Sequence, residues 1–140
     1  MPKRFLIFSV FLAGFALFLV APAAKTPVLV FPSKLPPPIK VWSGVASWYG
    51  FDFQGQATAS GQPFDGMLAT AAHPWLPFGS LLRLTDLTTG RSQLVRVNDR
   101  GPFVDDRDLD VSYIVAQRLG FLAQGVARLQ IELLREPPRQ

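Results

Sequence analysis

The chain has 140 residues, a formal net charge of +4 and no cysteine. This length suits a single domain, and without cysteine the chain cannot form a disulfide scaffold, a thiolate metal site, a thiol nucleophile or a lipid-modified cysteine. The overall charge misleads, because residues 43–134 carry seven arginines against eight aspartates and one glutamate, a net charge of −2. We therefore expect no nucleic-acid partner, since this region has no basic stripe for phosphates.

Residues 1–23 have the composition of an export segment. The basic start MPKR is followed by an uncharged apolar run of seventeen residues and then by the small residues of APA, Ala21 to Ala23. This order is typical of a cleaved signal peptide, but a run of this length is also close to the shortest that spans a bilayer. We expect either a signal peptide or a retained membrane anchor, and in both cases export to the periplasm or cell envelope. A retained anchor would tie the chain to the inner membrane.

Residues 24–42 contain repeated prolines, which predicts a semi-rigid, extended linker. After this stretch, short apolar runs are broken by glycine, proline and aspartate at close intervals. We place the folded domain at residues 43–134 and a short tail at residues 135–140.

Alternating apolar residues dominate the domain. The runs at residues 82–85 and 95–97 alternate on either side of TTG, which predicts a hairpin with Gly90 at a positive φ. Residues 126–134 alternate again and place Glu132 on the outward face of a strand. One helix is expected, with Ser112 as its N-cap and Gly120 at its end. Short strands, one short helix and glycine–proline turns indicate a small, mainly β barrel.

Aspartates are the candidate acids, because Glu132 is the first glutamate in the chain. Asp99 ends an alternating strand and is followed by a Gly-Pro turn, a place where barrels often keep functional groups. It is either an acid in a groove or an aspartate held in a tight turn or paired with Arg100. His73 is the only histidine, so a histidine metal site is not expected, and its alternatives are a structural, hydrogen-bonded role or a role in the site. No serine lies in a G-x-S-x-G elbow.

Aromatic residues gather in SWYGFDFQG, residues 47–55, which is too rich in glycine and polar residues to give a regular apolar period. Their rings either fill the core or form a platform on which sugar rings stack. The sequence leaves these two interpretations open.

Four motifs occur in order along the domain: GVASWYG (residues 44–50), TASGQPFDG (58–66), TAAHPWLPFGS (70–80) and VRVNDRGPF (95–103). Together they resemble the rare lipoprotein A (RlpA) family of septal lytic transglycosylases. The resemblance covers residues 43–134. It implies a six-stranded double-psi β-barrel with one or two short helices, related to expansins.

The resemblance also implies an activity. Members of the family cleave the MurNAc–GlcNAc bond of peptidoglycan glycan strands, preferring strands stripped of peptides, and leave 1,6-anhydro-MurNAc ends. A carboxylic acid protonates the glycosidic oxygen, and the C6 hydroxyl of the sugar attacks C1, so no water is needed. One acid/base group can then suffice, whereas ordinary glycosidases use two carboxylates. We expect peptidoglycan as the partner, no cofactor, no metal and a monomer.

Site residues follow from the resemblance position by position. Asp99 matches the catalytic acid, and His73 matches a catalytic-site histidine beside it. The residues expected to contact substrate are Gln62, Trp48, Tyr49, Asp65, Asn98 and Arg100.

Gln62 departs from the family pattern, in which this position is typically glutamate. A glutamine keeps the shape and hydrogen bonds of glutamate but carries no negative charge and takes up no proton. The alternative function is therefore a non-catalytic, expansin-like barrel that binds peptidoglycan or another polysaccharide.

Overall fold

The computed structural model describes residues 34–104 and 106–138. The predicted signal peptide or anchor at residues 1–23 and the linker residues 24–33 lie outside this part of the chain. Within the described ranges, no helix combines the length and the apolar character needed to cross a membrane.

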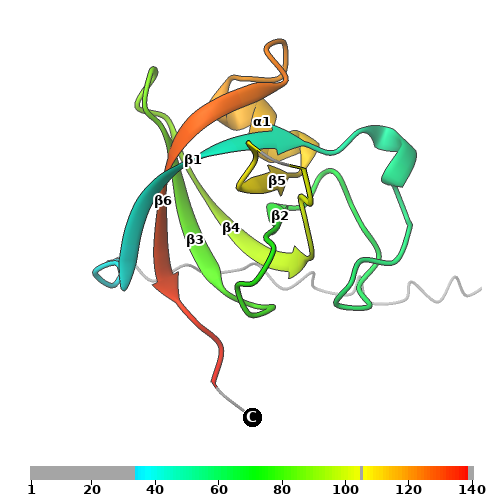
Figure 1. Ribbon diagram of the computed structural model, residues 1–140, viewed down its shortest axis with the longest axis horizontal. Helices are drawn as coiled ribbons and strands as arrows, with labels where there is room; N and C mark the ends of the chain where they lie inside the picture. The colour runs from blue at the N-terminus through cyan, green and yellow to red at the C-terminus, as the bar shows by residue number, and fades with distance from the viewer. Residues whose placement is uncertain (1–33, 105, 139–140) are drawn as a thin grey trace, which may run out of the picture. The chain divides into compact units, whose positions relative to one another are not determined.

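In this part of the chain, six strands form a closed barrel (Figure 1), with one α-helix and one 3-10 turn outside it. This confirms the mainly β, six-stranded barrel predicted from the sequence. The strands are β1 (Lys40–Trp48), β2 (Thr70–Ala72), β3 (Leu81–Asp86), β4 (Ser92–Asp99), β5 (Leu109–Val111) and β6 (Val126–Arg135). The helix α1 covers Tyr113–Leu119, and the 3-10 turn η1 covers Phe51–Phe53.

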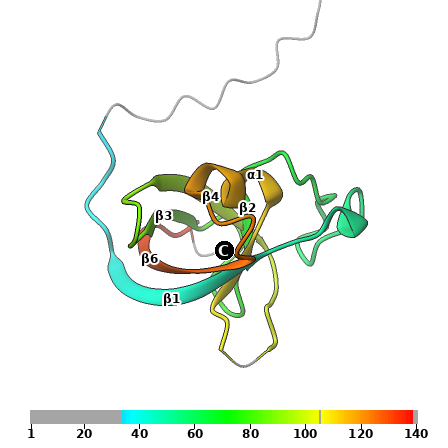
Figure 2. The ribbon, with the colours of Figure 1, turned by 90° about the horizontal axis from the view of Figure 1, so that it is seen from above.

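The order of strands around the barrel is β1-β5-β2-β4-β3-β6, and β6 pairs with β1 to close it. Two neighbouring pairs are parallel, β1 with β5 and β2 with β4, and the other pairs are antiparallel. Figure 2 shows the strands from above, with α1 beside them. Because β2 and β4 run in the same direction, their last residues, Ala72 and Asp99, pair with each other.

The core fills the barrel with side chains from the inward faces of the strands and from α1. The alternation that predicted β3, β4 and β6 is visible in their burial, since every second residue of the central part of each strand is covered. The largest fully buried side chains are those of Leu76, Leu82, Leu84, Leu109, Leu119, Leu129 and Ile131. The barrel is thus a packed core, and functional groups must lie at its ends.

The predicted turns are confirmed. β3 and β4 form the hairpin, with Gly90 at φ +72°. The helix ends at Gly120 in the left-handed conformation, which glycine adopts without a steric cost. Ser112 precedes the helix with the extended backbone of an N-cap, but its side chain makes no capping hydrogen bond.

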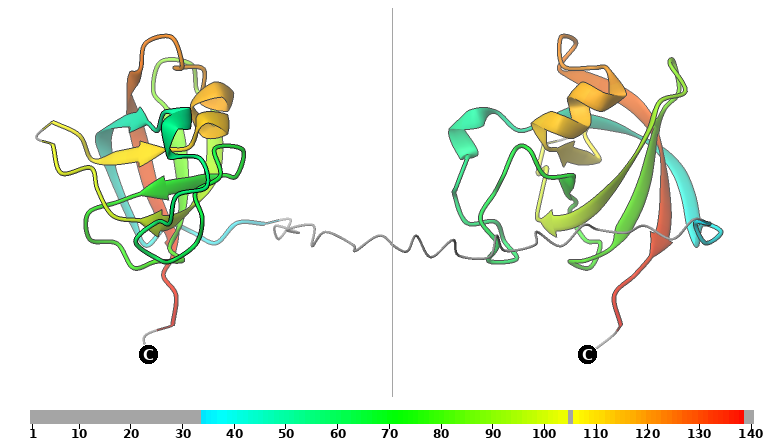
Figure 3. Two further views of the ribbon diagram at one scale, coloured as in Figure 1. Left: turned by 90° about the vertical axis from the view of Figure 1, so that its right-hand side faces the viewer. Right: turned by 180° about the vertical axis from the view of Figure 1, so that it is seen from behind.

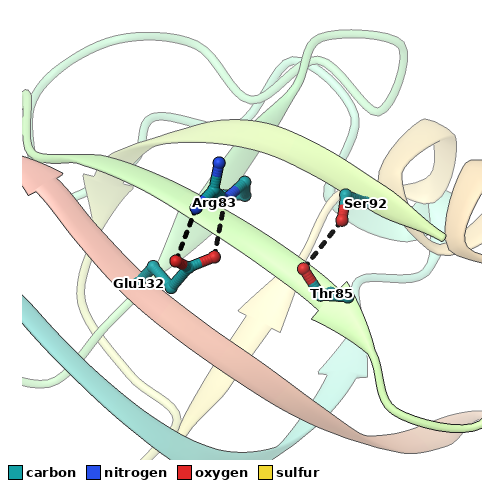
Figure 4. Close-up of polar contacts among 4 residues, drawn as sticks. All are labelled: Arg83, Thr85, Ser92 and Glu132. Carbon is teal, nitrogen blue, oxygen red and sulfur yellow. Dashed lines mark hydrogen bonds and ion pairs between the residues drawn. The ribbon is translucent and has the colours of Figure 1, made fainter. Parts of the chain in front are cut away.

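Glu132 alternates with the core residues Ile131 and Leu133, as expected for the outward face of β6, but its side chain is covered. Glu132 on β6 lies directly opposite Arg83 on β3, and the guanidinium donates two hydrogen bonds of 2.5 and 2.6 Å to the carboxylate (Figure 4). Only 5% of Glu132 remains exposed. The alternation placed it on the outer face, but alternation does not reveal which residue of the next strand covers it. On the same strand β3, Thr85 contacts Ser92 of β4 across 2.7 Å.

The first strand begins earlier than the boundary at residue 43. Lys40, Val41 and Trp42 already belong to β1 and pair with β6. These three residues directly follow the proline-rich stretch and are too few to show an alternating apolar pattern, so the sequence did not separate them from the linker. At the other end, β6 extends to Arg135.

Candidate active site

The candidate site lies at the ends of β2 and β4, beneath the long connection between β1 and β2. In Figure 3 (left), this connection, coloured teal to green, passes in front of β2 and β4. Hydrogen bonds fix it there, since Ser60 N–H donates to the carbonyl of Asn98 at 3.3 Å. The parallel pairing of β2 with β4 therefore places His73, which follows β2, beside the end of β4.

Asp99 is held by three neutral donors. Its Oδ1 accepts hydrogen bonds from the backbone N–H of Ala59 and from its own neighbour Arg100 N–H, both at 2.8 Å. Its Oδ2 accepts from the hydroxyl of Tyr49 at 3.0 Å. The side chain is half-buried. The carboxylate therefore combines a turn-like bond to Arg100 N–H with contacts from two distant segments, 40 and 50 residues away in sequence.

The aromatic ring of Tyr49 is packed so that its hydroxyl points to Asp99. The ring lies 4.8 Å from that of Phe64 and 5.7 Å from that of Phe53, centroid to centroid. Burial, and then the nearby charge of Asp99, raises the pKa of Tyr49 well above its ordinary value. The hydroxyl thus stays protonated and acts as a hydrogen-bond donor.

His73 is buried, with 2% of its surface exposed, between the rings of Trp42 and Trp75. Its Nδ1 accepts hydrogen bonds from the backbone N–H groups of Leu76, at 3.2 Å, and Trp75, at 3.3 Å. Burial lowers the pKa of His73 to about 4, so the imidazole is neutral at neutral pH. Its link to the candidate acid runs through the main chain, from His73 N–H to the carbonyl of Asp99 at 3.2 Å.

Arg100 does not pair with Asp99. Its guanidinium donates to the carbonyl of Leu76 at 2.8 Å and lies 3.8 Å above the ring centroid of Phe78. A weaker bond of 3.4 Å reaches the carbonyl of His73. The side chain therefore anchors the connection between β2 and β3, and the proposed ion pair with Asp99 is absent from the described structure.

Gln62 and Asn98 meet at the tip of a tight loop. Ala57 and Pro63 form an isolated antiparallel bridge, and Gly61 between them has φ +86°, which favours glycine. Thr58 closes the loop by donating from both its N–H and its hydroxyl to the carbonyl of Gln62, at 2.8 Å each. The amide of Asn98 then donates to the Gln62 side-chain oxygen across 3.5 Å.

Two other predicted residues lie in supporting positions. Asp65 accepts a bond of 2.9 Å from Met67 N–H and one of 3.4 Å from the Gln54 amide, so it orders the turn that follows Phe64. Trp48 is half-buried, and its ring packs edge-on against Tyr113 of α1 at 5.9 Å. The structure thus gathers Tyr49, Asp99, Asn98 and Gln62 at one end of β4, and it sets Trp48 against the helix.

A polar pocket of about 400 Å³, which we call the Arg96 pocket, is lined by Asn98, which precedes Asp99, and by Ser60, which follows the Ala59 that binds Asp99. Ser60 and Gln62 line one wall, Phe78 and Gly79 line the other, and β4 residues 96–98 form the floor. Arg96 had not been singled out in the sequence. The alternation of β4 was the available signal, because Arg96 and Asn98 must share one face of the strand.

The contributions of backbone groups were also missed. Ala59 N–H donates to Asp99, yet its side chain carries no functional group that sequence reasoning can detect. In the described ranges, no three histidine, aspartate or glutamate side chains converge as a metal site would require.

The sequence profile of a family described as lytic transglycolase matches residues 41–131. The chain is 52% identical over 89 residues to "Endolytic peptidoglycan transglycosylase RlpA" of Pseudomonas aeruginosa strain UCBPP-PA14, an alignment that covers 64% of this chain and 26% of that protein. It is 50% identical over 90 residues to the protein of the same name from Neisseria meningitidis serogroup A, covering 64% of this chain and 38% of the relative. The chain thus spans well under half the length of these relatives.

Solved structures with a similar fold include a Streptomyces papain inhibitor, with a TM-score of 0.58 and 22% identity, covering 71% of this chain and 99% of the other. The expansin of Clavibacter michiganensis has a TM-score of 0.55 and 21% identity, covering 71% of this chain and 53% of the expansin. At such identities the likeness shows the fold alone. That fold is the expansin-like double-psi barrel that the sequence predicted.

Proposed function

Because the chain belongs to the lytic transglycolase family, which includes the RlpA proteins, we propose that it is an endolytic peptidoglycan transglycosylase. It would cleave the bond between MurNAc and GlcNAc within glycan strands, preferably strands stripped of peptides, and release 1,6-anhydro-MurNAc ends. The single observation that carries this proposal is the position of Asp99. Its half-buried carboxyl group lies at the end of a barrel strand and is oriented by three donors, and the residue before it, Asn98, lines a polar pocket.

In the proposed reaction, Asp99 acts first as the acid. Its carboxyl proton passes to the glycosidic oxygen as the bond from that oxygen to C1 of MurNAc breaks. The resulting carboxylate then accepts the proton of the C6 hydroxyl as O6 forms its bond to C1. Asp99 gives one proton to the leaving oxygen and takes one back from the C6 hydroxyl, so it ends the reaction in its starting state. The reaction therefore needs neither a water molecule nor a second carboxylate.

Tyr49 would position Asp99 during both steps. Its hydroxyl stays protonated, so it donates to Oδ2 whether the carboxyl group carries a proton or a charge. The backbone N–H groups of Ala59 and Arg100 fix the other oxygen. An acid held in this way keeps one orientation before the sugar binds. Such positioning lowers the entropic part of the activation barrier.

We assign His73 a positioning role. Its Nδ1 accepts from the backbone N–H groups of Trp75 and Leu76, and with a pKa of about 4 the imidazole is neutral at neutral pH, so it is not an imidazolium that could act as the acid. It shapes the loop that begins where β2 ends, and Arg100 fastens the same loop at the Leu76 carbonyl. Gln62 and Asn98 would contact the sugar from the wall and floor of the Arg96 pocket.

The place of action follows from the substrate. Peptidoglycan lies outside the inner membrane, and the apolar run in residues 1–23 is suited to export. We propose that the barrel works as a monomer in the periplasm or cell envelope, with membrane attachment if the apolar run is retained.

The experiment is to incubate the full chain with peptide-stripped glycan strands and to identify the new ends by mass spectrometry. We expect 1,6-anhydro-MurNAc ends from the wild type and none from Asp99→Asn. Asp86→Asn is the matched control, because Asp86 accepts two backbone N–H bonds in the β3–β4 turn and an asparagine oxygen accepts the same bonds. Cleavage by Asp99→Asn at the wild-type rate would show that another group is the acid.

Gln62 decides between the enzyme and the binding module. If the wild type binds glycan but forms no product, while Gln62→Glu forms 1,6-anhydro ends, the missing carboxylate limits catalysis and the chain acts as the non-catalytic barrel. Product from the wild type contradicts that alternative.

A further inference from the structure

The Arg96 pocket contains one positive charge and no negative charge. Arg96 is the one charged residue of its lining, and the other lining residues, among them Ser60, Gln62 and Asn98, are neutral. Arg96 is half-buried, and its guanidinium donates one long hydrogen bond of 3.4 Å to the carbonyl of Gly79. Over residues 34–104 and 106–138, the one carboxylate paired with a guanidinium is Glu132, which binds Arg83. Arg96 therefore forms no ion pair among those residues, and where it lines a second pocket with Arg135 and Glu136, these two residues carry opposite charges.

Neighbouring groups make the pocket a place for hydrogen-bond acceptors. Asn98 uses one amide hydrogen on Gln62, across 3.5 Å, and the accepting atom is the side-chain oxygen of Gln62. The amide nitrogen of Gln62 therefore stays available to donate toward the pocket. Because Gln62 is neutral, it adds a donor here and leaves the charge of Arg96 uncompensated, whereas a glutamate would place a carboxylate in the same wall.

The position of the pocket restricts what it can bind. It is floored by residues 96–98, and Asp99 is the next residue along β4. Ala59 N–H binds the Asp99 carboxylate, and Ser60, the next residue, lines the pocket, so a ligand group there would be attached to the sugar at the cleavage point or to its neighbour. On a glycan strand of alternating GlcNAc and MurNAc, the acidic substituent is the lactyl group of MurNAc, which ends in a carboxylate when no peptide is attached and in an amide when one is.

We propose that the Arg96 pocket is a subsite for this lactyl carboxylate, with Arg96 as the residue that binds it. The inference rests on the proposed function for the nature of the strand. A guanidinium matches a carboxylate with two parallel hydrogen bonds, and a partly buried site strengthens each of them. When a peptide occupies the lactyl group, the pocket faces a neutral, bulkier amide. The pocket thus selects strands from which the peptides have been removed.

Binding to two chemically matched ligands tests the subsite. The full chain carries Asp99→Asn so that the strands stay intact, and the ligands are stripped strands with free lactyl carboxylates and the same strands with those groups converted to methylamides. We expect about tenfold tighter binding of the free carboxylate, equivalent to about 1.4 kcal/mol, and a smaller difference at high salt. Equal binding of the two ligands would overturn the proposal without any further variant.

Variants of Arg96 then assign the preference. Arg96→Gln should bind both ligands equally, whereas Arg96→Lys, which keeps the charge, should retain part of the preference. Arg91→Gln is the matched control, because Arg91 is exposed in the β3–β4 turn, away from the pocket lining, and it should keep the full tenfold difference. A tenfold preference that survives in folded Arg96→Gln, verified by its thermal unfolding, would overturn the assignment.

The outcomes separate the subsite from the proposed activity. A preference for the free carboxylate in a chain that forms no 1,6-anhydro ends would contradict the transglycosylase and leave the subsite standing. Formation of 1,6-anhydro ends with no preference between the two ligands would support the transglycosylase and overturn the subsite.

Discussion

Two carboxylates in this barrel, the buried Glu132 and the half-buried Asp99, are held in opposite ways. Glu132 lies on the wall between β3 and β6 and receives two hydrogen bonds from the guanidinium of Arg83 (Figure 4). Asp99 lies at the end of β4 and receives its bonds from a hydroxyl and two backbone N–H groups. One carboxylate is neutralised by a full positive charge, and the other is oriented by neutral donors.

The difference indicates what each group can do. The pairing with Arg83 lowers the pKa of Glu132, so this carboxylate stays charged and its function is to join two strands. Neutral donors fix the orientation of Asp99 without committing its charge to a partner. A carboxyl group that must give and take a proton needs this second arrangement, which is why we place the chemistry at the end of β4.

Removing the proton-transfer group should have the largest effect. We expect Asp99→Asn to lower the rate of strand cleavage by about a thousandfold, within the range typical of general acid–base catalysis. The change in stability should be small, because the asparagine oxygen can keep both N–H bonds and the Tyr49 hydroxyl can rotate to accept from the amide nitrogen. The rate of 1,6-anhydro formation measures it. A loss of stability that accounts for the whole loss of rate would assign Asp99 to structure.

As the pH falls, the protein should lose the stability contributed by His73 before it loses that of the Arg83–Glu132 pair. The pKa of His73 is about 4 in the folded chain and about 6.5 when unfolded, so its contribution is complete above pH 6.5 and is lost as the pH falls toward 4. The free energy of unfolding should decrease by up to about 3 kcal/mol across this window. Denaturant unfolding at a series of pH values measures it.

His73→Asn is the variant that assigns this loss. An asparagine side-chain oxygen can accept the N–H bonds of Trp75 and Leu76 and does not titrate, so the decrease between pH 6.5 and 4 should disappear. Glu132 has a lowered pKa, and its contribution persists until the pH falls below its ordinary value of 4.5. The same decrease in His73→Asn as in the wild type would contradict the assignment to His73.

Breaking the wall pair should cost stability and spare the chemistry. We expect Glu132→Gln to lower the free energy of unfolding by about 2 kcal/mol, less than for a fully buried pair because about a third of Arg83 is exposed. The rate of cleavage per folded molecule should be unchanged. The double variant Arg83→Met/Glu132→Leu, which leaves no unpaired charge, should recover part of the stability. A strong loss of cleavage rate in folded Glu132→Gln would contradict the claim that Glu132 serves stability alone.

Loss of one orienting donor should have the smallest effect. Tyr49→Phe keeps the ring packing against Phe53 and Phe64 and removes the hydroxyl bond to Asp99. We expect about a tenfold slower cleavage, equivalent to ~1.4 kcal/mol for one hydrogen bond. Phe53→Leu, which alters the packing and leaves the hydroxyl, is the matched control. An unchanged rate in Tyr49→Phe would show that the two backbone donors orient Asp99 sufficiently.

Much of the fold was predictable because its signals are local. The alternation in β3, β4 and β6, the glycine at position 90 and the helix end at Gly120 each depend on a few adjacent residues. The exposure of Glu132 was not predictable, since the covering residue, Arg83, is 49 positions away in sequence and reaches it only through the β3–β6 register.

The site was predictable in part for the same reason. Residue types and motifs pointed to Asp99 and Tyr49, but the bond between them depends on how the β1–β2 connection folds over β4. The contribution of Ala59 comes from its backbone, and every residue except proline has that N–H group. The buried state of His73 arises from Trp42 and Trp75, which flank it from two different segments. Long-range packing, and not residue type, sets these features.

The most direct test of the account is cleavage of peptide-stripped strands in water enriched in oxygen-18. The account predicts new 1,6-anhydro-MurNAc ends without heavy oxygen, because the C6 hydroxyl attacks C1 and Asp99 alone transfers the protons. New reducing ends that carry oxygen-18 would show hydrolysis by water and contradict the account.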